Sequence, residues 1–293
     1  MEYGVVYPQT EVPPDRGWIR AFAQTVESSG YNHILAYEHI LGVHAGHPRS
    51  VQGPYGLEDH FISPLLMFSN MAAVTEKLGF ATAVIVLPQR DAILLAKQAA
   101  SLDVLCGGRL RIGVGVGWNA AEFDALGAEF HDRGRRVEEQ LAVLRALWTQ
   151  PKAEFAGDWY RFADVGIRPL PLQRPIPIWL GGYVDATLRR VAKIGQGWFP
   201  GFSSAAEAEP VLATLASYVE AAGRSWEEIG IEVRIRYEQG DLDALGAQIE
   251  AWSQIGVTHL SLNTMRSGLK DGAEHLRAIE RFAGLFNAQA QVG

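Results

Sequence analysis

Short hydrophobic segments alternate with amphipathic segments along the whole chain. Eight of the hydrophobic segments are three to nine residues long and have the length of β-strands. Two of them, Gly79–Leu87 and Leu110–Val116, show no inside–outside alternation, as expected of strands in a sheet that is covered on both faces. We predict strands at Tyr3–Val6, His33–Tyr37, Gly79–Leu87, Leu110–Val116, Ile176–Leu180, Gly197–Phe199, Ile231–Ile235 and His259–Leu262.

The amphipathic segments have apolar residues at helical spacing, as Trp18, Phe22 and Val26 illustrate. We predict helices at Asp15–Ser29, Pro64–Thr75, between the third and fourth strands, from about Arg133 to Trp148, at Ala186–Ile194, Ala205–Ala222, Leu242–Ile255, and from about Gly272 to Asn287. Eight strands that alternate with eight helices predict an α/β fold, a (β/α)₈ TIM barrel, and we expect residues 1–293 to form one domain. In such a barrel the active site lies at the carboxyl ends of the strands.

An open, doubly wound sheet is the alternative to the barrel. Such a sheet would place a G-x-G-x-x-G turn directly after its first strand, whereas the string GVGVG of this chain (Gly113–Gly117) ends the fourth strand. The barrel is therefore preferred. Two long segments interrupt the repeat, Leu41–Ile62 and Gln150–Pro175, and we expect both to be irregular and to serve as binding loops on the ligand side.

Composition narrows the class of protein. Of the 293 residues, 48% are hydrophobic and 20% are charged, which is typical of a soluble globular protein. No apolar run approaches the roughly 20 residues of a membrane helix, and no secretory signal is recognisable, so we expect a cytoplasmic protein. Cys106 is the single cysteine, which excludes an internal disulfide and a cysteine-based metal site. The net charge of −7 argues against nucleic acid as a partner.

Glu38 and His39 are the first candidates for chemistry, because they follow the second predicted strand and should face the mouth of the barrel. A histidine there donates a proton near neutral pH or bonds to a bound ring. The alternative is a histidine that caps a loop. His44, His47 and His60 have no spacing typical of metal ligands, and no metal site is expected.

Glycine-rich segments follow the fourth and fifth strands. Gly117, Trp118 and Asn119 combine close backbone approach with a flat side chain that suits a planar ligand. Gly181 and Gly182 lead into a helix, and free N–H groups at a helix N-terminus bind phosphate. The alternatives remain open: these glycines merely turn the chain, Asp185 is only an N-cap, and Thr82, Ala83 and Val84 belong to an ordinary buried strand.

The chain resembles the bacterial luciferase-like monooxygenase superfamily, and within it the branch that uses the deazaflavin coenzyme F420. The resemblance covers most of the chain and is strongest in AILLAKQAASLDVLCGGRLRIGVGVGWNAAEF, HDRGRRVEEQLAVLRALWT, FAGDWYRF, RPIPIWLGGY and IGQGWFP. It implies a (β/α)₈ barrel with an insertion, a flavin-type cofactor, a small-molecule substrate and a homodimer. F420-dependent hydride transfer is our first hypothesis. An FMN-dependent monooxygenase and a non-catalytic flavin-binding subunit are the alternatives.

The resemblance also implies roles for particular residues. Glu38 and His39 match the acidic–histidine pair of the family, with His39 as the proton donor beside the flavin ring. The non-proline cis peptide of the family falls at Ala83–Val84, against the ring. Ring contacts are implied near Gly117, Trp118 and Asn119, and a phosphate site at Gly181, Gly182, Tyr183, Val184 and Thr187.

Three departures from the family pattern bear on function. Trp118 stands where sugar-phosphate dehydrogenases have a glutamate, which argues against that substrate. Val116 replaces the phosphate-binding arginine of light-emitting luciferases, which argues against light emission. Glu38 replaces the usual aspartate with a longer acid. The aromatic loop residues Tyr55, Phe61, Trp159 and Tyr160 point to an apolar or planar substrate.

Overall fold

The computed structural model describes residues 1–49, 53–238 and 241–290, with side chains as far as 287. The barrel strands lie close to their predicted positions. They are β1 (Glu2–Val6), β2 (His33–Ala36), β3 (Gly79–Thr82), β4 (Ile85–Val86), β5 (Leu110–Gly115), β8 (Ile178–Gly181), β9 (Gly197–Phe199), β10 (Gly230–Arg236) and β11 (His259–Asn263).

These strands form a closed parallel barrel. Their order is β3-β2-β1-β11-β10-β9-β8-β5-β4, and β3 also pairs with β5, which closes the sheet into a cylinder. The short β4 continues the line of β3 and pairs with β5 as well, so eight strand positions surround the axis. The predicted (β/α)₈ barrel is therefore confirmed, and the open sheet is wrong.

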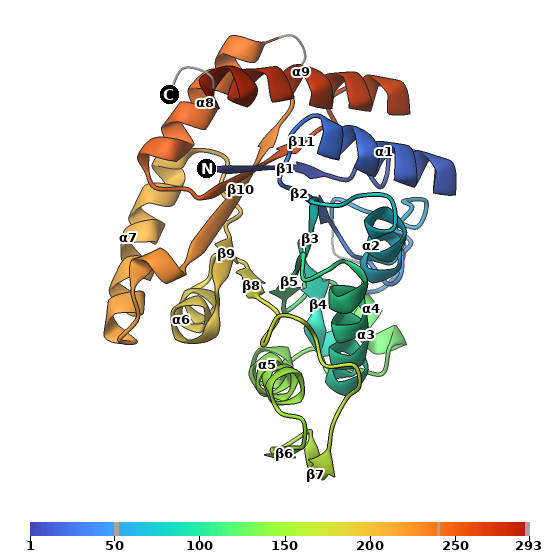
Figure 1. Cartoon of the computed structure of the whole chain (residues 1–293). Coiled ribbons are helices and arrows are strands. Elements are labelled where there is room, and N and C mark those ends of the chain that lie inside the picture. Colours follow the sequence, from blue (N-terminus) through green and yellow to red (C-terminus); the bar gives the residue numbers. More distant parts are fainter. Residues whose placement is uncertain (50–52, 239–240, 291–293) are drawn as a thin grey trace.

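Helices surround the barrel (Figure 1). They are α1 (Arg16–Ser28), α2 (Pro64–Ala72), α3 (Ala92–Leu105), α4 (Ala120–Ala125), α5 (Arg133–Thr149), α6 (Asp185–Ile194), α7 (Ala205–Ala221), α8 (Leu242–Gln254) and α9 (Gly272–Ala290), with 3₁₀ turns η1 (Leu87–Gln89) and η2 (Trp226–Glu228). None of these helices, over the residues that the structure describes, is long and apolar enough to cross a membrane.

Two predictions of local structure are wrong. The third strand does not run unbroken from Gly79 to Leu87, because a cis peptide between Ala83 and Val84 divides it into β3 and β4. The segment Gln150–Pro175 is not irregular throughout, since β6 (Ala153–Ala156) and β7 (Arg161–Val165) form an antiparallel hairpin. Figure 1 shows this hairpin beyond α5, away from the barrel. The short helix α4 was not predicted.

Hydrophobic side chains form two separate clusters. The larger one lies between the strands and the surrounding helices and includes Ile34, Phe80 and Leu141. The smaller one contains Leu35, Ala81, Trp179 and Phe199 among its members. Leu35 and Ala81 alternate along their strands with residues of the larger cluster, so the smaller cluster fills the interior of the barrel. The interior is thus packed and leaves ligand space only at its ends.

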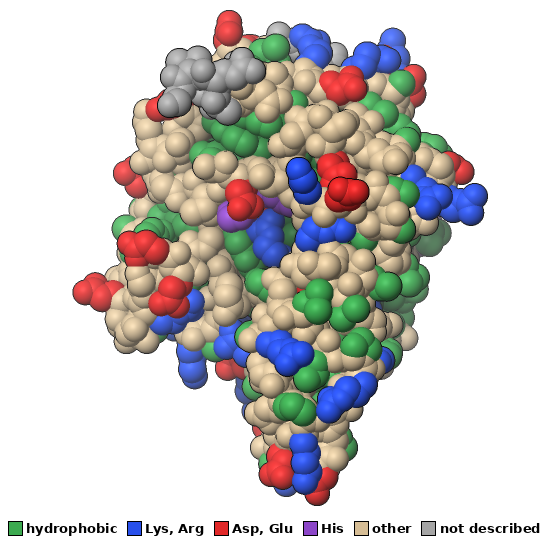
Figure 2. Space-filling view, in the orientation of Figure 1, with side chains coloured by type: hydrophobic (Ala, Val, Ile, Leu, Met, Phe, Trp, Pro, Cys, Tyr) green, Lys and Arg blue, Asp and Glu red, His purple; other side chains and the backbone are tan. Residues whose placement is uncertain are grey.

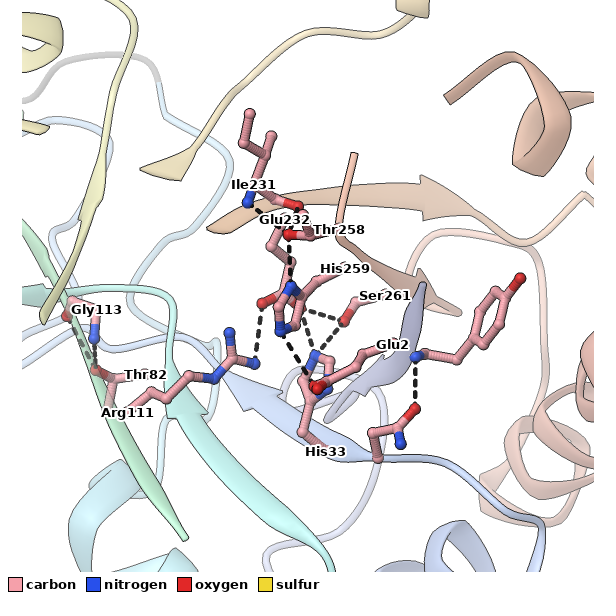
Figure 3. Close-up of polar contacts among 12 residues, drawn as sticks. Glu2, His33, Thr82, Arg111, Gly113, Ile231, Glu232, Thr258, His259 and Ser261 are labelled. Atoms are coloured by element: carbon pink, nitrogen blue, oxygen red, sulfur yellow. Dashed lines mark hydrogen bonds and ion pairs between the residues drawn. The ribbon is translucent and has the colours of Figure 1, made fainter. Parts of the chain in front are cut away.

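A polar cluster fills the interior near the N-terminal ends of the strands (Figure 3). Glu232 on β10 is fully buried; its Oε1 lies 2.6 Å from His33 Nε2 and accepts a hydrogen bond of 2.6 Å from Ser261 Oγ. Arg111 Nη2 lies 3.1 Å from Glu232 Oε2, and the Arg111 guanidinium stacks 4.4 Å from the Trp179 ring centroid. Figure 2 shows histidine, basic and acidic side chains together in a hollow near the middle of the molecule.

The electrostatics of this cluster favour an ionised Glu232. Burial opposes the negative charge, but His33, Arg111 and Ser261 outweigh it and hold the pKa of Glu232 well below 4.5. Burial lowers the pKa of His33 from its usual 6.5, so this ring is neutral and donates from Nε2 to the carboxylate. Glu2 bonds to His259 at the rim, and this hydrogen bond lowers the pKa of Glu2 to about 2.

Candidate active site

A cavity of about 690 Å³ lies at the carboxyl ends of the barrel strands. This volume falls within the range of roughly 300–1,000 Å³ typical of small-molecule sites. The residues that line it are the last residues of β4, β5 and β8, residues that follow β2, β3, β5 and β8, and one residue on β10. They are Tyr37, Glu38, His39, Tyr55, Ala83, Val84, Val86, Gly115, Val116, Gly117, Trp118, Gly181, Gly182, Tyr183, Val184, Thr187 and Arg234.

The structure thus brings together eleven of the twelve residues selected from the sequence. Asn119 is the exception, since it lines a neighbouring cavity of about 100 Å³ that also includes His39 and Tyr55. Its side chain is 7% exposed, and Oδ1 has no hydrogen-bond partner in the described part of the chain. Asn119 is the residue before α4 and so belongs to the adjoining wall.

His39 stands between the two cavities in an aromatic surround. Its ring centroid lies 5.1 Å from that of Tyr55, 4.9 Å from that of Phe61 and 5.8 Å from that of Trp118, each in an edge-on arrangement. Its side chain is 13% exposed. The three rings restrict the water around the imidazole and fix its orientation.

Glu122 on α4 holds one nitrogen of this ring. Its Oε1 lies 2.8 Å from His39 Nδ1, and its Oε2 accepts a hydrogen bond of 2.9 Å from Gln89 Nε2. Because an ionised carboxylate only accepts hydrogen bonds, Nδ1 carries the proton and donates to Glu122. No described residue bonds to Nε2 of His39, so this is the ring nitrogen left for a bound ligand.

Glu38 bonds to an arginine and not to His39. Arg90 Nε donates to Glu38 Oε2 at 3.0 Å, and Arg90 Nη2 donates to Oε1, which makes a two-pronged ion pair. The Glu38 side chain is 3% exposed and that of Arg90 is 21% exposed. Glu38 therefore lines the cavity with its negative charge balanced by Arg90. Its side chain, longer than that of an aspartate, reaches Arg90 just before α3.

The predicted non-proline cis peptide lies at Ala83–Val84 and is confirmed. Glycines on neighbouring strands leave space for Val84: a Cβ on Gly115 would lie 2.5 Å from Val84 Cγ2, and one on Gly181 would lie 2.9 Å from Cγ1. These two glycines therefore have a packing reason to be glycine. Gly117 adopts φ +81°, a left-handed conformation that favours glycine, as the chain leaves β5 toward Trp118.

The segment after β8 forms an open cradle at the start of α6. Gly182 has φ +121°, and a Cβ there would lie 3.2 Å from Thr187 Oγ1, so glycine leaves room beside this hydroxyl. The first turn of α6 has no side-chain cap, and backbone N–H groups at a helix N-terminus attract anions. Tyr183 and Val184 are 63% and 56% exposed and form the outer rim. This arrangement suits a phosphate group.

Four further residues, not selected from the sequence, contact the candidate site residues or line the cavity: Gln89, Arg90, Glu122 and Arg234. Each follows a barrel strand or lies in its carboxyl-terminal part, and this position is the signal in the sequence that could have identified them. Conversely, no residue of Gln150–Pro175 lines the large cavity. Tyr160 instead accepts a hydrogen bond from Ala92 N at 3.0 Å, so the aromatic residues of this segment pack against α3 and α5.

Comparisons with known proteins agree with this geometry. Residues 1–259 match the family described as luciferase-like monooxygenase. The chain belongs to this family. An uncharacterized protein of Mycobacterium tuberculosis is 30% identical over 292 residues, 97% of this chain and 98% of the relative. An FMNH₂-dependent dimethylsulfone monooxygenase of Pseudomonas putida is 35% identical over 189 residues, 63% of this chain and 48% of that protein.

Solved structures of two enzymes share the fold. A monooxygenase from Streptomyces bottropensis superposes with a TM-score of 0.83 at 19% identity and covers 99% of this chain and 100% of its own. A coenzyme F420-dependent tetrahydromethanopterin reductase from Methanopyrus kandleri gives a TM-score of 0.76 at 16% identity, over 96% and 97% of the two chains. The family comprises oxidoreductases, and the solved structures that share the fold include a monooxygenase and an F420-dependent reductase.

Proposed function

We propose that this luciferase-like protein is an F420-dependent oxidoreductase that transfers a hydride between the reduced deazaflavin and a small organic substrate. The observation that carries the proposal is the single cavity wall that joins His39, the Ala83–Val84 peptide and the Gly181–Gly182 cradle. The sequence blocks that resemble the F420 branch support this choice of cofactor. An F420-dependent reductase also shares the fold over nearly its full length.

The residues present fit a flavin-type cofactor. Gly182 and Thr187 with the uncapped first turn of α6 would hold its phosphate, and Ala83, Val84 and Trp118 would contact its ring. When bound in its reduced form, the cofactor supplies the hydride. The contribution of the chain is to orient the reactants and exclude water.

His39 performs the proton chemistry in this proposal. Its Nε2 gives a proton to the substrate as negative charge develops and takes one in the reverse direction. Glu122 accepts from Nδ1 at 2.8 Å, holds the ring in one tautomer and stabilises the protonated ring. Tyr55, Phe61 and Trp118 keep bulk water from the imidazole.

An FMN-dependent monooxygenase is the second candidate. The 35% identity with the FMNH₂-dependent dimethylsulfone monooxygenase favours it. The same cradle serves either cofactor, since both carry a phosphate next to the same ribityl chain.

The cofactor is tested by titrating the purified protein separately with F420 and with FMN while absorbance and tryptophan fluorescence are recorded. Trp118 is 38% exposed in the cavity wall, so a bound ring is expected to quench its fluorescence. The first proposal predicts that F420 binds at least tenfold more tightly than FMN, about 1.4 kcal/mol. Tight FMN binding without F420 binding would support the monooxygenase, and saturable binding without turnover would indicate a non-catalytic subunit.

Thr187→Val tests the phosphate cradle. The substitution preserves side-chain shape but removes the hydroxyl beside Gly182. Loss of one hydrogen bond to a charged group is expected to weaken cofactor binding about 10- to 100-fold. Thr187→Ser retains the hydroxyl and should bind within a few-fold of wild type. Equal affinities for wild type and Thr187→Val in fluorescence titrations would remove Thr187 from the cradle.

A further inference from the structure

Arg234 on β10 is a cationic side chain of the cavity that the proposed reaction does not use. Glu232 and Arg234 lie on the same face of β10, while Val233 and Ile235 pack in the outer cluster. Arg234 is therefore directed to the barrel interior, two residues closer to the carboxyl end of β10 than Glu232 of the polar cluster. It lines the cavity together with His39 and Tyr55.

The charge of Arg234 is not neutralised by the described residues. Its Nη2 donates to the backbone carbonyl of Pro200 at 2.8 Å, and its guanidinium forms no ion pair with a carboxylate in the described ranges. Glu38, the acidic residue of the cavity lining, is occupied by Arg90. Glu232 is occupied by Arg111 and His33. Arg234 thus presents a partly buried positive charge to the cavity.

A second guanidinium strengthens the field on this side. Arg266 Cζ lies 5.6 Å from the Tyr55 ring centroid, and Arg266 donates to the carbonyl of Pro54. Burial raises the pKa of Tyr55, whereas the charges of Arg266 and Arg234 oppose that rise. Tyr55 and Arg234 both line the cavity. Asp59 is the acidic residue that also acts on Tyr55, and its carboxylate accepts from Gly56 N at 2.7 Å.

We propose that the substrate carries an oxyanion, such as a carboxylate, sulfonate or phosphate, and that Arg234 binds it. The planar guanidinium matches such groups with two parallel hydrogen bonds. Tyr55 and Trp118 would flank the flat or apolar remainder of the substrate beside His39. This inference rests on the proposed function, because that proposal places the reaction at His39.

The test compares benzoate with its neutral isostere benzamide by isothermal titration calorimetry. Each probe is titrated into wild-type protein, first without cofactor and then with saturating F420 or FMN. We expect benzoate to bind at least tenfold more tightly than benzamide. Arg234→Gln should weaken benzoate binding about 10- to 100-fold and leave benzamide within twofold. Arg234→Lys keeps the positive charge, and its affinity for benzoate should lie between those of wild type and Arg234→Gln.

Arg20→Gln is the matched control, since it removes one exposed positive charge from α1, in the outer layer of the fold. This variant should bind benzoate and benzamide with the same affinities as wild type. Equal binding of benzoate to wild type and Arg234→Gln would overturn the proposal. So would an equal loss of cofactor affinity in Arg234→Gln, because the guanidinium would then serve the cofactor. If neither cofactor binds but benzoate selectivity still depends on Arg234, the anion site stands and the proposed function fails.

Discussion

Replacing His39 by alanine is expected to lower kcat about 10²- to 10⁴-fold, the range of a general acid–base group. Cofactor affinity should stay within a few-fold of wild type, because the proposed phosphate cradle follows β8, three strand positions from β2 around the barrel. Steady-state kinetics with a turned-over substrate and fluorescence titration of the cofactor measure the two quantities separately. His131→Ala removes an exposed imidazole and should leave both unchanged.

Glu122→Gln separates the proton transfer by His39 from its orientation. Glutamine keeps the size of the side chain but cannot balance a positive charge on the ring. We expect kcat to fall about 10- to 100-fold, less than in His39→Ala, since one hydrogen bond to a charged group is lost. Unchanged kcat in Glu122→Gln would remove Glu122 from its positioning role. Unchanged kcat in His39→Ala would make His39 a structural residue.

The second large effect concerns stability. Glu232→Leu is expected to reduce the free energy of unfolding by about 3–5 kcal/mol, because it leaves the partly buried Arg111 without its carboxylate. The double variant Arg111→Met/Glu232→Leu removes both charges and should recover most of the loss. Lys152→Gln breaks an exposed ion pair with Asp164 and should change stability by less than about 1 kcal/mol. Urea unfolding followed by tryptophan fluorescence measures all three.

The pH dependence of unfolding follows from the same cluster. The pKa of Glu232 is lowered in the folded protein, so its contribution is complete above about pH 4.5 and is lost as the pH falls below that value. The lowered pKa of His33 also reduces stability as the pH falls below 6.5, because the unfolded chain takes up a proton on this histidine at a higher pH than the folded protein does. Glu232→Leu should therefore lose less stability than wild type between pH 5 and pH 3. Parallel curves for the two proteins would show that Glu232 does not contribute.

The agreement between sequence and structure has a local cause. Strand and helix segments were recognisable because each buries a continuous apolar run or a helical stripe, and both patterns are properties of neighbouring residues. Glu38, His39 and the glycines after β8 were found because the carboxyl ends of parallel strands meet at one mouth. The cis peptide at Ala83–Val84 came from the family resemblance and not from local patterning.

The hairpin β6–β7 shows where local reasoning stops. Prolines and aromatic residues in Gln150–Pro175 suggested irregular structure near the ligand, yet the hairpin packs outside α5. Its position is fixed by contacts with distant residues, for example between Glu139 and the backbone N–H groups of Trp159 and Tyr160. Such contacts leave no periodic signal in the sequence.

By itself, the sequence determined the closed barrel, the mouth at which the large cavity lies and most of the residues that line this cavity, since these depend on the order and polarity of local segments. Only the tertiary structure decided the partners: His39 with Glu122, Glu38 with Arg90, Glu232 with Arg111, and Arg234 with no carboxylate in the described residues. The three pairs join residues that are 52 to 121 positions apart in the sequence, and the charge of Arg234 stays open to the cavity. Such distances and charges exist only once the strands have closed around a common axis.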